Sequence, residues 1–186
     1  PAEETTASKP VGSTAPMEPA GDATPEPEPP APSTDEPDPN VDGLPYIVDP
    51  FEVSYQYPHP ELPTVESFME LPFTLGYIDT EEGGRNWIAP REGVPQVETS
   101  LKALNEGGGG VFWSTALARI SSTISRVLIN DDLLGVFVIP DPSQISSAPG
   151  SIGRDLRAAD QTELTILITV GRVVESRTVA RGERIS

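Results

Sequence analysis

The side chains that most often perform chemistry in proteins are scarce in this sequence. It contains no Cys and one His, His59, which stands between Pro58 and Pro60. A Ser-His-Asp arrangement needs an imidazole held by a third group, and a zinc site needs several nitrogen or sulfur ligands. The sequence around His59 offers neither arrangement. We therefore expect His59 to lie in a surface loop, and we expect no catalytic residue, no metal ligand and no cofactor.

Acidic side chains are the next candidates, because carboxylates bind calcium. They cluster at Glu81 and Glu82, at Asp131 and Asp132, and near Asp141. None of these clusters has the alternating ligand positions and central Gly of a calcium loop. We expect solvated acids in turns.

Two large aromatic residues could serve as anchors for a partner. Trp87 and Trp113 are of the residue type that dominates binding hot spots. Packing in the core is the alternative, and we favour it for both side chains.

The first part of the chain differs sharply in composition from the rest. Residues 1–50 contain one Lys and eleven Asp or Glu, and so carry −10 of the formal net charge of −17. Many of the 22 prolines lie there, and few apolar side chains do. Such a segment cannot offset the entropy lost on ordering, so we expect residues 1–45 to be a disordered, extended tether. Its role is either a spacer that projects the domain or that of an inert leader.

The composition also excludes several classes of partner. The chain has 12 Lys and Arg against 29 Asp and Glu, and its basic residues are not clustered. Nucleic acids and anionic membrane surfaces are bound by clustered basic residues, so we expect neither as a partner. No stretch approaches the roughly 20 apolar residues that span a bilayer, so we expect no direct membrane insertion by this segment.

Strand-like patterns dominate residues 46–96, which we interpret as a β-rich extension. Apolar residues alternate with polar ones over 51–57, and weaker strands are expected at 73–78 and 86–89, joined by a turn at 81–84. Thr64 is the expected N-cap of a short helix ending at Met69.

Residues 97–186 read as strand, helix, strand, strand. The strands are expected at 97–101, at 136–139 and in one long apolar run over 164–170 and 173–179 that Gly171 interrupts. The glycines at 107–110 are expected to form a flexible joint rather than a phosphate loop. The strong helix covers 114–130, with Ser114 as its cap and apolar residues at helical spacing. We expect one core formed by Leu117, Ile120, Ile124, Val127, Phe137, Ile139, Leu164, Ile166 and Ile168. The expected fold class is α+β, a small mixed sheet with one or two helices on one face.

The second half of the chain resembles a polypeptide-transport-associated (POTRA) domain, as found in haemolysin-activator-like, two-partner-secretion outer-membrane transporters. In that family a helix leads into a short apolar strand that ends near Pro, followed by a polar loop and a long strand with a Gly-Arg-hydrophobic sequence. Here the strand ends at Pro140, and the later sequence is Gly171-Arg172-Val173. The glycines at 107–110 stand where the family has its first helix, and the loop at 143–160 is longer.

The resemblance implies where a partner would bind. In a POTRA-like sheet the strand at 136–139 lies on an edge, so its unpaired N–H and C=O groups can capture an extended peptide, while the neighbouring helix forms the wall of a groove. The candidate binding residues are Val136, Phe137, Val138, Ile139, Ser122 and Arg126. The alternative is an edge that binds nothing.

A structural role is expected for Gly171 and Arg172. Gly171 would permit a bulge or a tight turn in the long strand. Arg172, at the bend, would pair with an acid or contact a following domain.

The resemblance implies a non-catalytic module rather than an enzyme. It would work in the periplasm at the outer membrane of a Gram-negative-type bacterium and guide unfolded or secreted client polypeptides. Its other expected partner is a neighbouring domain or barrel of the same chain. The alternative is a structural scaffold, or a ring domain like those of secretins.

Overall fold

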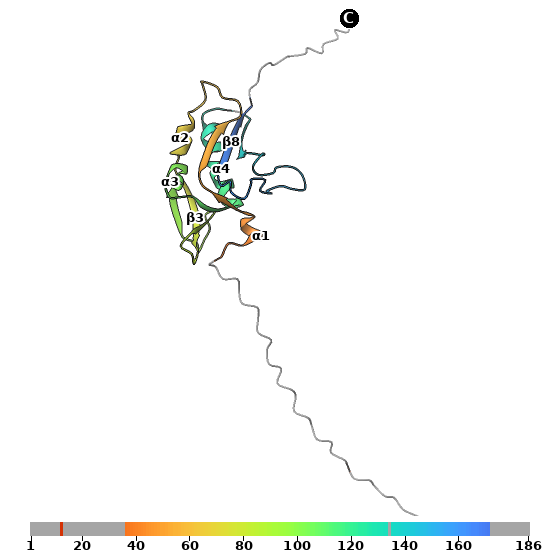
Figure 1. Ribbon diagram of the computed structural model, residues 1–186. Coiled ribbons are helices and arrows are strands. Elements are labelled where there is room, and N and C mark those ends of the chain that lie inside the picture. The colour runs from red at the N-terminus through yellow and green to blue at the C-terminus, as the bar shows by residue number, and fades with distance from the viewer. Residues whose placement is uncertain (1–11, 13–35, 134, 172–186) are drawn as a thin grey trace, which may run out of the picture. The chain divides into compact units, whose positions relative to one another are not determined.

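The computed structural model describes residue 12 and residues 36–133 and 135–171 (Figure 1). The strand expected at 173–179, Arg172 and residues 1–11 and 13–35 of the expected tether lie outside the described residues. Residues 36–45, also assigned to the tether, are described and contain a short helix, Pro39–Asp42, and the start of the first strand, so the tether prediction is wrong for these residues. The helices are α1 (Pro39–Asp42), α2 (Val65–Met69), α3 (Leu101–Glu106) and α4 (Ser114–Asn130). The strands are β1 (Pro45–Val48), β2 (Phe51–Tyr55), β3 (Phe73–Asp79), β4 (Arg85–Ile88), β5 (Gln96–Thr99), β6 (Gly110–Trp113), β7 (Val136–Pro140) and β8 (Leu164–Val170).

The fold is α+β, as expected, with two sheets. The larger sheet has the order β1-β6-β4-β3-β5, and the smaller one has the order β2-β8-β7. In the smaller sheet β2 runs parallel to β8, and β7 runs antiparallel to β8. The parallel pair joins strands more than one hundred residues apart, which requires the intervening chain to cross over between them.

The boundary at residue 96 does not separate two folding units. The smaller sheet combines β2 from before that residue with β7 and β8 from after it, and the larger sheet pairs β4 with β6 across the same boundary. The expected strand at 97–101 is also revised. β5 ends at Thr99 and pairs with β3 on the edge of the larger sheet, not with a strand of the second half. The strand beside β8 is β2, from the β-rich extension.

A helix that the sequence analysis did not identify follows β5 directly. α3 begins after Ser100, whose Oγ accepts a hydrogen bond of 3.2 Å from the N–H of Ala103. Leu101 and Leu104 on its inner side are buried in the core. Ser100 is therefore a helix cap, and Leu101 belongs to the helix rather than to a strand.

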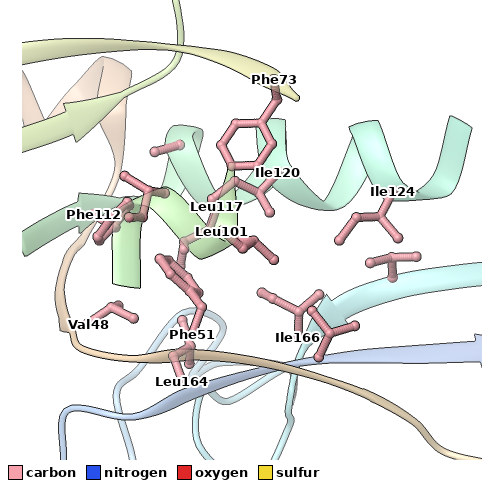
Figure 2. Close-up of a cluster of buried hydrophobic side chains, with 14 of the residues drawn as sticks. Val48, Phe51, Phe73, Leu101, Phe112, Leu117, Ile120, Ile124, Leu164 and Ile166 are labelled. Carbon is pink, nitrogen blue, oxygen red and sulfur yellow. The ribbon is translucent and has the colours of Figure 1, made fainter. Parts of the chain in front are cut away.

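α4 has the expected length, and its apolar side faces the core. Leu117, Ile120 and Ile124 are buried against strands of both sheets (Figure 2). The cap at its start differs from the expectation, because Trp113 occupies the N-cap position. The hydroxyl of Ser114 instead contacts Leu44, accepting from its N–H at 3.0 Å.

The core prediction is wrong for two residues of β7. Phe137 and Ile139 are 65% and 40% exposed, whereas Val138 between them is buried. Successive side chains of a strand point to opposite faces. In β7 the face that meets α4 and the core therefore carries Val138, while Phe137 and Ile139 lie on the outer face of the sheet.

The opposite edge of the smaller sheet is partly covered. The amide of Asn105, the next-to-last residue of α3, bonds both backbone groups of Phe51 in β2. Its Oδ1 accepts from the N–H at 2.8 Å, and its Nδ2 donates to the C=O at 2.9 Å. The side chain thus occupies the bonding position that a neighbouring strand would take.

Candidate functional site

β7 forms the other edge of the smaller sheet. Two backbone hydrogen bonds just outside the strand show which residues of β7 direct their N–H and C=O groups toward β8. Gly171 N donates to Gly135 O at 2.9 Å, and Asp141 N donates to Thr165 O at 2.9 Å. In an antiparallel pair, every second residue exchanges both of its backbone bonds with the partner strand. The odd-numbered residues of β7 are therefore the ones that bond to β8.

The even-numbered residues turn their backbone groups the other way. Within the described part of the chain, no strand pairs with that side of β7. Val136 and Val138 each present an N–H and a C=O there, and Pro140 presents only a C=O because proline has no N–H. The edge thus offers a short ladder of alternating donors and acceptors.

A groove of about 420 Å³ runs between this edge and α4. Small side chains on one face of the helix leave the space open, since positions three and four apart lie on the same face. Among the described residues that line the groove, none is charged. The lining residues are Tyr46, Ser114, Leu117, Ala118, Ser121, Ser122, Ser125, Val138, Ile139, Pro140 and Ile145.

The serine hydroxyls of the groove wall differ in their bonding. Ser122 Oγ donates to the C=O of Arg119 at 2.9 Å, which satisfies it within the helix. Ser121 is only 8% exposed, and its Oγ has no hydrogen-bond partner among the described residues. The wall therefore combines an apolar surface with one unsatisfied buried hydroxyl.

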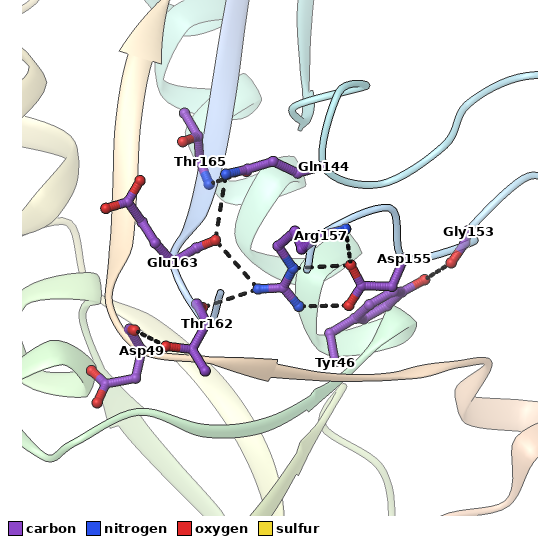
Figure 3. Close-up of polar contacts among 9 residues, drawn as sticks. All are labelled: Tyr46, Asp49, Gln144, Gly153, Asp155, Arg157, Thr162, Glu163 and Thr165. Atoms are coloured by element: carbon purple, nitrogen blue, oxygen red, sulfur yellow. Dashed lines mark hydrogen bonds and ion pairs between the residues drawn. The ribbon is translucent and has the colours of Figure 1, made fainter. Parts of the chain in front are cut away.

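Tyr46 and Ile145 connect the groove to the long loop of residues 141–163. The Tyr46 hydroxyl donates to Gly153 O at 2.7 Å (Figure 3). Ile145 is buried and forms a bridge with Asp155 across the loop. The loop is therefore an ordered part of the groove, although its length and its Ser, Pro and Gly content suggested only a polar connection.

Arg157 holds the base of this loop. Its side chain is 2% exposed and makes an ion pair of 2.8 Å with Asp155, and its Nη1 donates to Thr162 O at 3.0 Å and Glu163 O at 3.3 Å. The side-chain hydrogen bond from Arg157 lowers the pKa of Asp155 below its ordinary value, although partial burial acts in the opposite direction. The charged form of Asp155 is thus the one that the loop stabilises.

The predicted binding residues fall into three groups. Val138 and Ser122 line the groove, and Ile139 borders it along the strand, although its side chain lies on the outer face of the sheet. Val136 and Phe137 lie on the edge strand, but their side chains do not line it. Arg126 is exposed on α4 and is not among the lining residues.

Sequence reasoning missed the other residues of the wall. Ala118, Ser121 and Ser125 have the helical spacing of one face, and this run of small side chains was the available signal. Tyr46 and Ile145 come from distant segments, and no local pattern links either residue to α4.

The other residues considered in the sequence analysis pack in the core or lie in loops and strands away from the groove. Trp87 and Trp113 are buried, and Trp113 Nε1 donates to Asn86 Oδ1 at 3.3 Å. His59 Nδ1 lies 3.3 Å from the N–H of Glu61, within a loop. Gly171 continues the ladder from β8 by bonding to Gly135. Across the residues that the structure describes, no group of three or more potential metal ligands comes together.

A second hollow, of about 480 Å³, lies between the turn at 83–84, α3 and the glycines at 107–110. The glycines there permit close packing. A Cβ on Gly109 would overlap the carbonyl of Val48, and one on Gly110 would lie 3.0 Å from Trp87 Nε1. This explains the glycine run as a backbone requirement.

Comparison of the chain with protein-family models, with curated proteins and with solved structures found no match. None of the described helices has the length and apolar character needed to cross a membrane.

Proposed function

We propose that this domain captures an extended segment of another polypeptide by adding it to the open edge of β7. The captured strand would bond to the backbone groups of Val136, Val138 and Pro140, and its inner side chains would enter the groove beside α4. Binding of this kind depends on main-chain hydrogen bonds, with side-chain pockets giving selectivity.

One observation carries the proposal: the open edge and the groove coincide. An uncovered edge strand is a hazard for aggregation, and proteins commonly cover it or place charges on it. Here β7 carries no charged side chain, and two of its apolar side chains, Phe137 and Ile139, are exposed. An edge kept in this state beside an uncharged groove has the features of a binding site.

We propose further that the captured segment is an unfolded or secreted client and that the domain is a periplasmic module of an outer-membrane translocation or assembly transporter. This setting rests on the resemblance to POTRA domains. Its support is the order of elements, in which a helix precedes an edge strand ending at Pro140 and a long central strand follows. The alternative of a scaffold or secretin-like ring domain requires no peptide at β7.

The direct experiment is a chemical-shift titration with an uncharged extended peptide of about six residues, the usual length of a strand. We expect weak affinity, in the micromolar-to-millimolar range, with shifts in β7 and along the Ser121 face of α4. Because the chain is acidic, the titration is repeated with a basic peptide at ~0.5 M salt, where the Debye length is roughly 4 Å and nonspecific attraction is screened. Shifts confined to other surfaces, or no shifts at millimolar peptide, would favour the scaffold alternative.

A further inference from the structure

The side chain of Ser121 lowers the stability of the free domain. Its hydroxyl is buried in the groove wall, and the described residues give it no hydrogen-bond partner. A buried polar group without a partner is destabilising, and Ala at the same helical position would avoid that cost and favour the helix. The described residues of the free domain therefore give no reason for a hydroxyl at this position.

We infer that Ser121 selects captured segments that place a short hydroxyl side chain, Thr or Ser, against the groove wall. This inference rests on the proposed capture of a strand at β7 and names the class of segment that is preferred. The Ser121 Oγ is closed to solvent in the free domain, so the contact requires the side chain to rotate its Oγ into the groove. In that position a hydroxyl can both donate to Ser121 and accept from it. A Val side chain has nearly the shape of Thr but leaves Ser121 unsatisfied.

The remaining wall explains why the preferred side chain is uncharged. None of the described residues that line the groove is charged, so a Lys, Arg, Asp or Glu entering it would lose water without gaining an opposite charge from them. Apolar walls at Leu117 and Val138 favour a side chain that also carries a methyl group. Thr meets both conditions and is also a good strand former.

Strand geometry limits the preference to particular positions of the segment. Alternate residues of a strand added to β7 face the same side as Val138, toward α4, and the residues between them face outward with Phe137 and Ile139. The preference for a hydroxyl is therefore confined to an inward position, and outward positions tolerate either side chain.

The experiment replaces Thr by Val, one position at a time, along an uncharged Thr- and Val-containing peptide, and measures affinity for three proteins. These are the unmodified chain, Ser121→Ala and Ser122→Ala. Ser122 is the matched control, because it lines the same groove but its hydroxyl already donates to Arg119. We expect the unmodified chain to favour Thr at one inward position by about three- to tenfold, the range of a single net hydrogen bond.

The variants separate this inference from the proposed function. Ser121→Ala is expected to remove the preference for Thr while still binding the peptides, and Ser122→Ala is expected to keep it. Binding with no Thr preference, or with one that survives Ser121→Ala, overturns the role of Ser121 and leaves strand capture intact. No binding by any of the peptides at millimolar concentration overturns both. In the free proteins, Ser121→Ala is expected to raise the melting temperature more than Ser122→Ala does.

Discussion

Phe51 and Phe112 meet edge to face, with ring centroids 4.7 Å apart, and so join the two sheets. Phe51 belongs to β2 of the smaller sheet, and Phe112 belongs to β6 of the larger one. Both side chains are buried, and α4 packs against strands of both sheets around them. The β-rich extension and the second half of the chain therefore share one core.

The shared core predicts a single cooperative unfolding transition. Phe112→Ala is expected to cost about 3–5 kcal/mol, because it leaves a cavity between the sheets. Thermal unfolding followed by tryptophan fluorescence and by far-ultraviolet circular dichroism should give coincident curves before and after the substitution. Two separate transitions would show that the sheets unfold independently.

The face of α4 that meets the core can be tested with two isoleucines of the same helix. Ile124 is 1% exposed and Ile129 is 56% exposed. Ile124→Ala is expected to lower the free energy of unfolding by about 2–4 kcal/mol, and Ile129→Ala by under about 0.5 kcal/mol. Denaturant titration measures both, and equal effects would contradict the orientation of the helix.

The alternation of β7 predicts opposite effects for proline at adjacent positions. Val138→Pro removes an N–H from the open edge, so peptide binding should weaken while the fold survives. Phe137→Pro removes an N–H that bonds to β8, so it should lower the free energy of unfolding more than Val138→Pro does. Peptide titration and denaturant unfolding are measured for each variant. Loss of stability in Val138→Pro alone would reverse the assignment of the open side.

Filling the groove should block binding without touching the edge. Ser122→Trp places a large side chain in the groove, and we expect affinity for the peptide to fall at least about tenfold. Asn130→Trp is the control, because Asn130 is exposed on the same helix and does not line the groove. Equal affinities of the two variants would show that the peptide does not enter the groove.

The Asp155–Arg157 pair predicts a pH dependence for the long loop. Because the folded state lowers the pKa of Asp155 from 3.8, the charged pair stabilises the loop above that value and is lost as pH falls through the lowered pKa. Hydrogen exchange, corrected for its intrinsic pH dependence, should show weaker protection of residues 144–157 on acidification. In Asp155→Asn the protection should be lower already at neutral pH and should lack this pH response. If the protection of this variant still changed with pH as before, a titrating group other than Asp155 would be responsible.

The parts of the fold that sequence could predict are those with long, regular patterns. α4 follows from Leu117, Ile120 and Ile124, whose spacing is helical over several turns. The position of β7 was predicted correctly, but the side chains predicted to face the core were the wrong ones. Four consecutive apolar residues conceal the period of two, so only the position of α4 distinguishes Val138 from Phe137.

Other features depend on contacts that no local pattern contains. The place of β2 beside β8 is set by pairs such as Val53 with Ile166, more than one hundred residues apart. α3 was missed because Leu101 continues the apolar residues of the preceding strand, although Ser100 was a usable cap signal. The sequence analysis predicted that the groove lies between a helix and an edge strand, and two of its predicted residues, Ser122 and Val138, line it. Its closure by Tyr46 and Ile145 depends on how the loop folds back.

The contact between Asn105 and Phe51 limits how many strands the smaller sheet can recruit. A sheet with two free edges can grow at both ends, and copies of it can join into open chains. The Asn105 amide takes the first bonding position on β2, so β7 is the edge left for growth within the described residues. Under the proposed capture at β7, each copy would take up one strand at that edge, and binding of the strand would use up the edge, so that assembly stops there.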